Sequence, residues 1–403
     1  MIYIGELSQL GPPGLTLIPK ISMDTTQPLP LLGGLSPQQF MKRHWQKKPL
    51  LVRQAIPGFT APLSRAALFE LAGREEVESR LVQQSPKSPG GWQMKNGPFD
   101  RKALPALRQR EWTLLVQGVD GHDAAVHSLL QQFRFVPEAR LDDLMVSYAT
   151  DGGGVGPHFD SYDVFLLQAH GQRRWRIGKQ KDFSLQEGVP LKILAHFEAE
   201  QEFVLEPGDM LYLPPRYAHD GVAQGECMTY SIGFRAPQQV ELARELLLRL
   251  ADDVVDGVAP SLYRDPQQPA VDTPGAIPAA LQAFALKAVE QALKDPLALA
   301  RVLGAYLTEP KANVWFDGGD TPDSLQHVAL ARSTRMVYDE QHIFINGEAF
   351  RAAGRDATLM RRLADQRELG HADLARASAG ALDLLTSWCE DGWLIANHAD
   401  EVP

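Results

Sequence analysis

The sequence predicts an α+β protein whose centre is a β-sandwich or barrel of the jelly-roll kind, followed by helices and a mixed C-terminal part. Short runs of β-branched, aromatic and aliphatic residues crowd between about Leu144 and Arg235. Apolar residues then recur at helical spacing, and both periods return after about Val314. The chain has 403 residues, 44% of them apolar, so two or three domains are expected.

The N-terminal part predicts two short helices and one strand. Residues 1–35 carry proline and glycine without clear periodicity, and we expect a loose extension there. A helix is predicted to begin at Pro37, because proline suits the first helical position. A strand is expected over 50–53, and Ser64 is predicted to cap the second helix.

The central region predicts a series of short strands. The runs are VFLLQ, RWRIG, EFVLE, DMLYLP and MTYSIGF. The turn signals HGQ, EPGD and AQGE are predicted to separate them. Several short strands at this spacing are typical of a sandwich or barrel.

The remainder of the chain predicts helices and then a second mixed unit. Three helices are expected, from about Val240 to Val254, from Leu281 to Leu293, and over PLALARVLGAYL. MVYDEQHIFINGEAF then predicts strands with turns at DEQ and at Asn346–Gly347. Short helices over TLMRRLADQREL and ALDLLTSWCEDG and a strand WLIA complete an order that resembles a winged helix.

Composition excludes several classes of function. Cys227 and Cys389 are too few for a disulfide framework or a thiolate zinc site, which fits a reducing cytoplasm. No apolar run is long enough to cross a bilayer, and no basic stretch precedes an apolar run as in a signal peptide. The formal charge is −10, and Asp320 to the end holds 14 acidic and 8 basic residues. We therefore expect a cytoplasmic protein that binds neither membrane nor DNA directly.

A candidate metal site comes from two separated segments. In GGGVGPHFDSYD, His158 and Asp160 are two residues apart and can point to one side of a strand. LEPGDMLYLPPRYAH then supplies a turn, a strand and His219, which the intervening strands can return to face the first two. Two histidines and one carboxylate on one face of an octahedral metal are typical of non-haem iron(II) oxygenases. The open positions would take a 2-oxo acid and oxygen.

A 2-oxo acid with a second carboxylate needs a cation, and QRRWRIG offers three arginines. Strand alternation places Arg173 on the side of Trp175 and opposite Arg174. Arginine suits the role because its planar fork can bind a carboxylate at two points. Alternatively, Arg173, Arg174 and Arg176 are all solvated strand charges.

Other interpretations of the H-x-D pair stay open. A loop histidine beside a capping aspartate is the ordinary explanation of such a pair alone, but the distal segment provides a matching third ligand. A four-ligand cupin usually has H-x-H and a following glutamate, whereas Tyr162, Asp163 and Val164 stand here. A zinc or nickel cupin acting as a hydrolase or isomerase, and a non-catalytic winged-helix protein-binding module, are the alternative functions.

Longer blocks carry a family resemblance. Between about Arg43 and Pro237 the sequence resembles the bacterial JmjC-type ribosomal oxygenases, protein arginine hydroxylases of the cupin superfamily, in RHWQKKPLLVR, WTLLVQGVD, LDDLMVSY, GGGVGPHFDSYDVFLLQ, GQRRWRIG, LEPGDMLYLPPRYAHDG and YSIGFRAP. The resemblance implies a double-stranded β-helix (JmjC/cupin) catalytic domain over 36–237. It implies a helical dimerisation region over 238–312 and a C-terminal winged helix over 313–403.

The resemblance also implies chemistry. It assigns hydroxylation at the β-carbon of an arginine in a large-subunit ribosomal protein, by a homodimer. It implies that 2-oxoglutarate is held by Arg173 and that iron(II) is bound by His158, Asp160 and His219. Two positions depart from the expected pattern, since Ala149 and Thr229 stand where a polar hydroxyl and an amide should line the co-substrate pocket.

Overall fold

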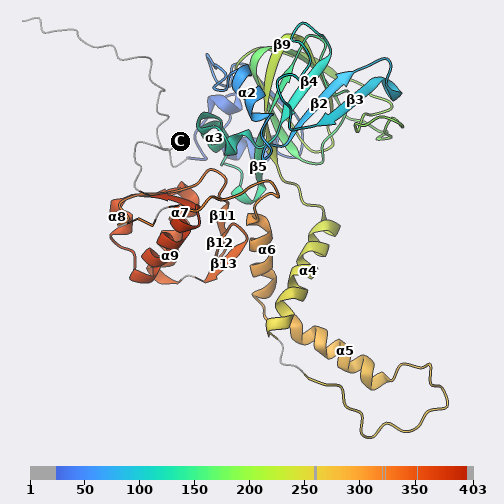
Figure 1. Ribbon diagram of the computed structural model, residues 1–403, viewed down its shortest axis with the longest axis vertical. Coiled ribbons are helices and arrows are strands. Elements are labelled where there is room, and N and C mark those ends of the chain that lie inside the picture. Colours follow the sequence, from blue (N-terminus) through green and yellow to red (C-terminus); the bar gives the residue numbers. More distant parts are fainter. Residues whose placement is uncertain (1–23, 258–260, 320, 323, 352, 397–403) are drawn as a thin grey trace, which may run out of the picture.

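The protein forms a β-rich body, a helical segment and a smaller mixed part (Figure 1). The computed structural model describes residues 24–257, 261–319, 321–322, 324–351 and 353–396. Helices α4 and α5 extend away from the β-rich body, and the C-terminal part lies beside α6.

The N-terminal extension is shorter than expected. Residues 1–23 lie outside the described residues, but Pro30–Leu32 form a 3-10 helix, η1. Leu31 and Leu32 are buried in the same core as Phe40. The expectation of a loose segment through residue 35 is therefore wrong for its last residues, because their leucines pack into the main core.

The predicted starts of the first two helices are confirmed. Helix α1 (Pro37–Arg43) begins with a capping box, in which Ser36 and Gln39 satisfy each other's backbone N–H groups. Ser64 accepts a hydrogen bond from the backbone of α2 (Arg65–Leu71). Helix α3 (Ala124–Gln131) was not predicted, and it packs three apolar side chains into the core.

The β-rich body is one nine-stranded antiparallel sheet that folds over itself. Its strands are β1 (Leu50–Val52), β2 (Ser79–Gln84), β3 (Trp92–Asn96), β4 (Trp112–Val116), β5 (Leu141–Ala149), β6 (Asp163–Gly178), β7 (Gln201–Leu205), β8 (Met210–Leu213) and β9 (Ala218–Phe234). The order is β1-β8-β6-β9-β5-β4-β2-β3, with β7 paired to β6. The first half of β6 lies between β8 and β9, and its second half lies between β7 and β9. The two long strands thus belong to both layers of a jelly roll, as predicted.

Two of the three predicted turns do not end a strand. HGQ lies within β6 and AQGE lies within β9, where the pairing shifts register between Gln168 and Gln172. Gly171 and Gly225 have positive φ values of 62° and 75°, which bend the backbone locally. Because β6 and β9 continue on both sides of these glycines, the chain does not reverse there. Only EPGD separates two strands, β7 and β8, with Gly208 at φ 92°.

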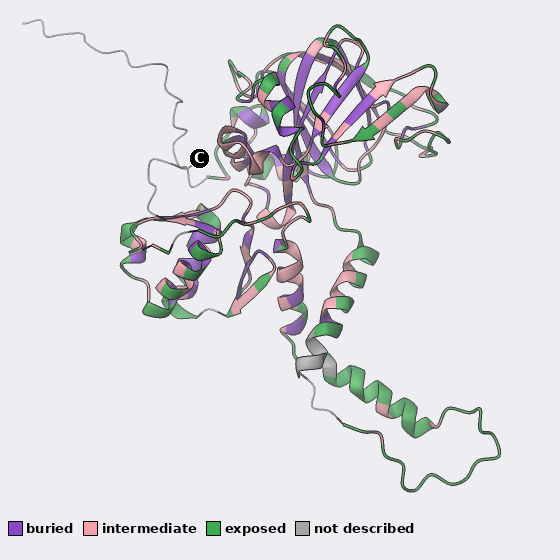
Figure 2. Cartoon of the chain, viewed as in Figure 1, coloured by how far each residue is buried: buried purple, intermediate pink, exposed green. Residues whose placement is uncertain are grey.

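The helical segment confirms the three expected helices, α4 (Gln239–Gly257), α5 (Ala279–Ala292) and α6 (Ala298–Thr308). Helices α4 and α6 pack through Leu250 and Val302. Most of α5 is exposed (Figure 2). Within the described residues, none of the helices has the length and apolar character needed to cross a membrane.

The described residues of the C-terminal part form two small sheets and three helices. One sheet joins β10 (Val328–Leu330), β14 (Glu368–Leu369) and β15 (Leu394–Ala396), and the other joins β11 (Met336–Tyr338), β12 (His342–Ile345) and β13 (Glu348–Arg351). The helices are α7 (Gly354–Gln366), α8 (His371–Leu374) and α9 (Ala379–Glu390). The predicted turns at DEQ and at Asn346–Gly347 are both confirmed. Asn346 and Gly347 have the positive φ values that a tight hairpin requires. Strands β10 and β14 and helix α8 were not predicted.

Charged side chains join this part to the barrel. Lys311 lies 3.1 Å from a carboxylate oxygen of Asp142 and 2.8 Å from one of Asp143. Arg335 donates to the backbone carbonyl of Asp142, and Arg134 donates to two carbonyls at the end of α7.

Candidate active site

Three side chains meet at one point, two from the irregular segment before β6 and one from β9. His158 forms only an isolated bridge and Asp160 lies outside any strand, so the expectation that the pair stands on a strand is wrong. The ligand atoms of His158, Asp160 and His219 all lie within 4.8 Å of one another. His219 Nε2 is 3.6 Å from an Asp160 oxygen, and the two imidazole centroids are 4.2 Å apart. The backbones of His158 and His219 exchange hydrogen bonds of 3.0 and 2.8 Å, so the H-x-D segment pairs with the start of β9. The sheet therefore brings together the three residues that the sequence singled out.

Backbone carbonyls set the orientation of both imidazoles. His158 Nδ1 lies 2.9 Å from the Gly156 carbonyl, and His219 Nδ1 lies 3.0 Å from the Tyr217 carbonyl. Because a carbonyl only accepts, each Nδ1 carries the proton and each Nε2 keeps a lone pair. Burial, helped by the neighbouring His158, lowers the pKa of His219 to about 4. Two imidazole nitrogens beside a carboxylate form a donor set that suits a transition metal.

The glycines before His158 allow its segment to approach the sheet closely. A Cβ on Gly153 would lie 2.5 Å from the Trp112 carbonyl, and one on Gly154 would lie 2.6 Å from the Gly221 carbonyl. A side chain at either position would force the backbone away from β4 or β9. These glycines thus position the first histidine, as close backbone approach commonly requires.

Arg173 is a buried cation on the inner face of β6. Its guanidinium donates to Ser147 Oγ at 3.1 Å and to the Gly221 carbonyl at 3.1 Å, and it stacks 5.0 Å from the centre of the Trp175 ring. Its Nε has no partner within the described residues, and no carboxylate there forms an ion pair with it. Burial lowers the pKa of Arg173. An isolated buried cation is costly, so an anion in contact with it would be strongly favoured.

The neighbouring arginines confirm the predicted alternation. Arg174 and Arg176 are partly exposed on the other face, where Arg176 binds Asp220 at 2.6 Å. Arg173 and Trp175 share the inner face, as expected. The alternative in which all three arginines are solvated is therefore wrong for Arg173.

Sequence reasoning did not identify the polar groups that hold Arg173. Ser147 and Thr229 form a cross-strand pair, and the Thr229 hydroxyl donates to Gln168 at 3.0 Å. Thr229 thus provides a polar contact although it departs from the expected amide, whereas Ala149 packs in an apolar cluster. Ser147 is the one hydroxyl-bearing residue before Tyr148 in the run LMVSYA, and a serine in such an apolar strand can indicate a buried polar contact.

Asp163 belongs to a buried hydrogen-bond network and not to the metal site. It is fully buried and accepts hydrogen bonds from Tyr212 at 2.6 Å and Gln46 at 3.0 Å. This network anchors the segment after α1 to the barrel.

Comparison with known proteins relates both parts of the chain to described families. The profile of a family described as JmjC domain matches residues 128–242, and that of a ROXA-like winged helix matches residues 291–395. The X-ray structure of Escherichia coli YcfD is 30% identical, with a TM-score of 0.77, and the match covers 89% of this chain and 98% of that one. The chain belongs to the JmjC-type ribosomal oxygenases.

Named relatives of this ribosomal oxygenase support the same family assignment. The ribosomal protein uL16 3-hydroxylase of E. coli is 41% identical over 234 residues, which span 57% of this chain and 60% of that protein. A probable ribosomal oxygenase of Haemophilus influenzae is 29% identical, with 90% of this chain and 96% of that protein covered. A structure of YcfD in complex with cobalt and 2-oxoglutarate has a TM-score of 0.74 at 29% identity and covers 90% of this chain.

Proposed function

We propose that this ribosomal oxygenase uses iron(II) and 2-oxoglutarate to hydroxylate the β-carbon of an arginine in a large-subunit ribosomal protein. The observation that carries the proposal is the cluster of His158, Asp160 and His219 in the same barrel as the buried Arg173. The name of the E. coli relative, a uL16 3-hydroxylase, supports the substrate class. The YcfD complex with cobalt and 2-oxoglutarate supports the metal site and the co-substrate.

The proposed ligands have distinct tasks. His158 and His219 would each present Nε2 to the metal, and Asp160 would present a carboxylate oxygen. Three protein ligands leave the other positions of an octahedral ion to small molecules. When bound, the iron would supply the oxygen activation that attack on an unreactive C–H bond requires. The carbonyls of Gly156 and Tyr217 prevent ring rotation and so keep the site in place.

Arg173 would bind the distal carboxylate of 2-oxoglutarate. Ser147 and the Gly221 carbonyl hold part of its guanidinium, while its Nε has no partner among the described residues. Trp175 covers one face of the guanidinium and excludes water from it. A preset cation in a dry site orients an anion with little reorganisation.

The function is tested by incubating the full-length protein with iron(II), 2-oxoglutarate and purified large-subunit ribosomal proteins. We expect succinate release and one added oxygen atom on a single arginine, detected by mass spectrometry of the digested proteins. NMR of the modified peptide would locate the hydroxyl group. Metal-dependent turnover of another substrate without succinate would instead support a cupin-type hydrolase or isomerase.

We also propose a homodimer formed through α4–α6. Leu286 and Val289 on helix α5 are 61% and 58% exposed, and Leu293 at its C-cap is 54% exposed. This is a larger apolar surface than a solvated helix normally carries. Two-fold pairing is the commonest way for a soluble protein to cover such a surface.

Sedimentation at micromolar concentration should give a dimer mass for the native protein. Leu286→Glu with Val289→Glu should give a monomer, because two buried charges would oppose contact. Leu262→Glu is a matched control, since Leu262 is 87% exposed in the connector before α5. A native monomer with full activity would contradict the assembly.

Cytoplasmic location and absence of DNA binding complete the proposal. The formal charge of −6 after residue 319 opposes contact with DNA phosphates. The domain limits 36–237, 238–312 and 313–403 remain predictions.

A further inference from the structure

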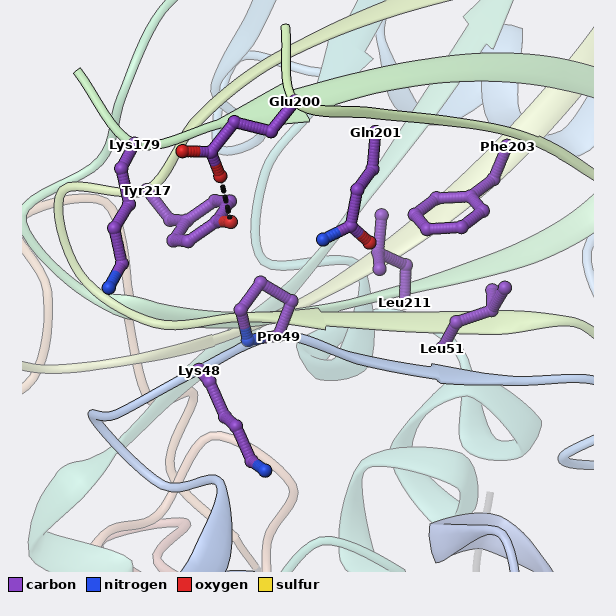
Figure 3. A pocket seen from close by; sticks show the side chains of 9 residues that line it. All are labelled: Lys48, Pro49, Leu51, Lys179, Glu200, Gln201, Phe203, Leu211 and Tyr217. Carbon is purple, nitrogen blue, oxygen red and sulfur yellow. Dashed lines mark hydrogen bonds between the residues drawn. The ribbon is translucent and has the colours of Figure 1, made fainter.

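A cleft of about 340 Å³ opens between two edge strands of the barrel (Figure 3). Strand β1 lies at the edge of one layer and β7 at the edge of the other. Leu51, Phe203 and Leu211 line its apolar end, while Lys48, Lys179 and Glu200 line its polar end. The cleft is therefore amphipathic along its length.

The cleft is separate from the proposed iron site. Across the layer, His219 on β9 pairs with Ile177 on β6, and Ile177 pairs with Gln201 on β7. Two strand spacings place Gln201 roughly 10 Å from His219. Ile177 is fully buried between them, and His158 lies beyond His219 on the opposite side. A molecule in the cleft would thus occupy a different edge of the barrel.

An arginine side chain bridges the two edge strands next to the cleft. Arg53 follows β1 and donates across the gap to the Val204 carbonyl at 2.6 Å and to Asp209. This contact occupies an outward-facing carbonyl of β7, so an extended peptide cannot pair along the whole strand. This contact and the small volume of the cleft favour a small molecule over an extended peptide.

The charges at the polar end of the cleft favour an anion. Within the described part of the chain, the ammonium groups of Lys48 and Lys179 have no ion pair or hydrogen bond. The Glu200 carboxylate already accepts a hydrogen bond of 2.9 Å from Tyr217. Two cations against one engaged carboxylate leave a net positive end.

We propose that this cleft binds a small amphipathic carboxylate. Its carboxylate would lie between Lys48 and Lys179, and its alkyl or aryl body would cover Leu51, Phe203 and Leu211. The volume lies at the lower end of the range for small-molecule sites. This binding does not require the proposed oxygenase activity, because neither lysine and none of the three apolar residues belongs to the metal or Arg173 site. Tyr217 also lines the cleft, and it contacts His219 through its backbone carbonyl.

The test is isothermal titration of the full-length protein with octanoate. Octanol and octylammonium test the need for a negative head group. We expect one site for octanoate and at least about tenfold weaker binding of the other two, since a lost charged contact is worth a factor of that order. Lys48→Gln with Lys179→Gln should weaken octanoate by at least about tenfold, whereas Lys192→Gln, an exposed lysine outside the cleft, should not change it.

Two further arms make the outcome decisive. Arg173→Ala should keep octanoate binding, and loss of binding in that variant would place octanoate in the co-substrate site and overturn the proposal. Equal binding of octanoate and octylammonium, or an unchanged affinity in the double lysine variant, would also overturn it. Displacement of octanoate by an acidic, apolar pentapeptide would overturn the small-molecule assignment in favour of a peptide.

Discussion

Alanine at His158 or at His219 should abolish iron(II) binding and succinate release while leaving the fold intact. Each substitution removes one of three ligands, and the part of the chain that the structure describes offers no other cluster of three metal-binding side chains. Loss of a supporting hydrogen bond alone costs about 10–100-fold in metal affinity, so loss of a ligand should cost more than about 100-fold. Iron content after dialysis and succinate release measure the two effects.

A matched histidine tests whether the effect is specific. His196 is exposed, and His196→Ala should bind iron and turn over normally. Circular dichroism and thermal melting should show a folded barrel in all three variants, because the ligands contribute little to the apolar core. Succinate production by either ligand variant would refute the assigned iron site.

Arg173→Ala should greatly weaken 2-oxoglutarate binding and spare iron. Truncating one partner of a desolvated, charge-assisted contact costs about 2–5 kcal/mol, or roughly 30-fold to several thousandfold in affinity. This loss of affinity should appear as a higher 2-oxoglutarate concentration for half-maximal succinate release. Iron affinity measured without 2-oxoglutarate should stay near that of the native protein.

The adjacent arginine provides the control. Arg174 projects from the other face of β6, so Arg174→Ala should leave the dependence on 2-oxoglutarate unchanged. The reverse result, with Arg173→Ala normal and Arg174→Ala impaired, would mean that the assigned face of the strand is wrong.

The parts of the fold that the sequence could predict depend on local chemistry. Ser36 and Ser64 indicate helix starts because their side chains accept hydrogen bonds from backbone N–H groups in the first helical turn. Asn346–Gly347 predicts a hairpin because both residues tolerate positive φ. The continuity of β6 and β9 could not be predicted, because the same glycine-containing segment can reverse a chain or bend it, and only the paired strand decides.

The candidate site divides in the same way. Residue spacing is a local property, and it is enough to single out His158 and Asp160. Strand alternation places Arg173 with Trp175 and opposite Arg174, but the choice of Arg173 as the co-substrate ligand comes from the family resemblance. Ser147 and Gly221 contact Arg173 from other strands, and their placement requires the cross-strand register. Leu31 and Leu32 were assigned to a loose segment because their burial depends on a core formed by distant residues.

The bulge in β6 also bears on how the gene can change in length. Loss or gain of one codon at residue 173 or 174 would turn every later side chain of that strand to the opposite face, removing Trp175 and Ile177 from the interior together. Between Gln168 and Gln172 the pairing is already irregular, so a codon gained there can enlarge the bend and leave both flanking registers in place. Tolerance to insertion and deletion should therefore be concentrated in these few codons, which join two halves of the strand that must each keep their length.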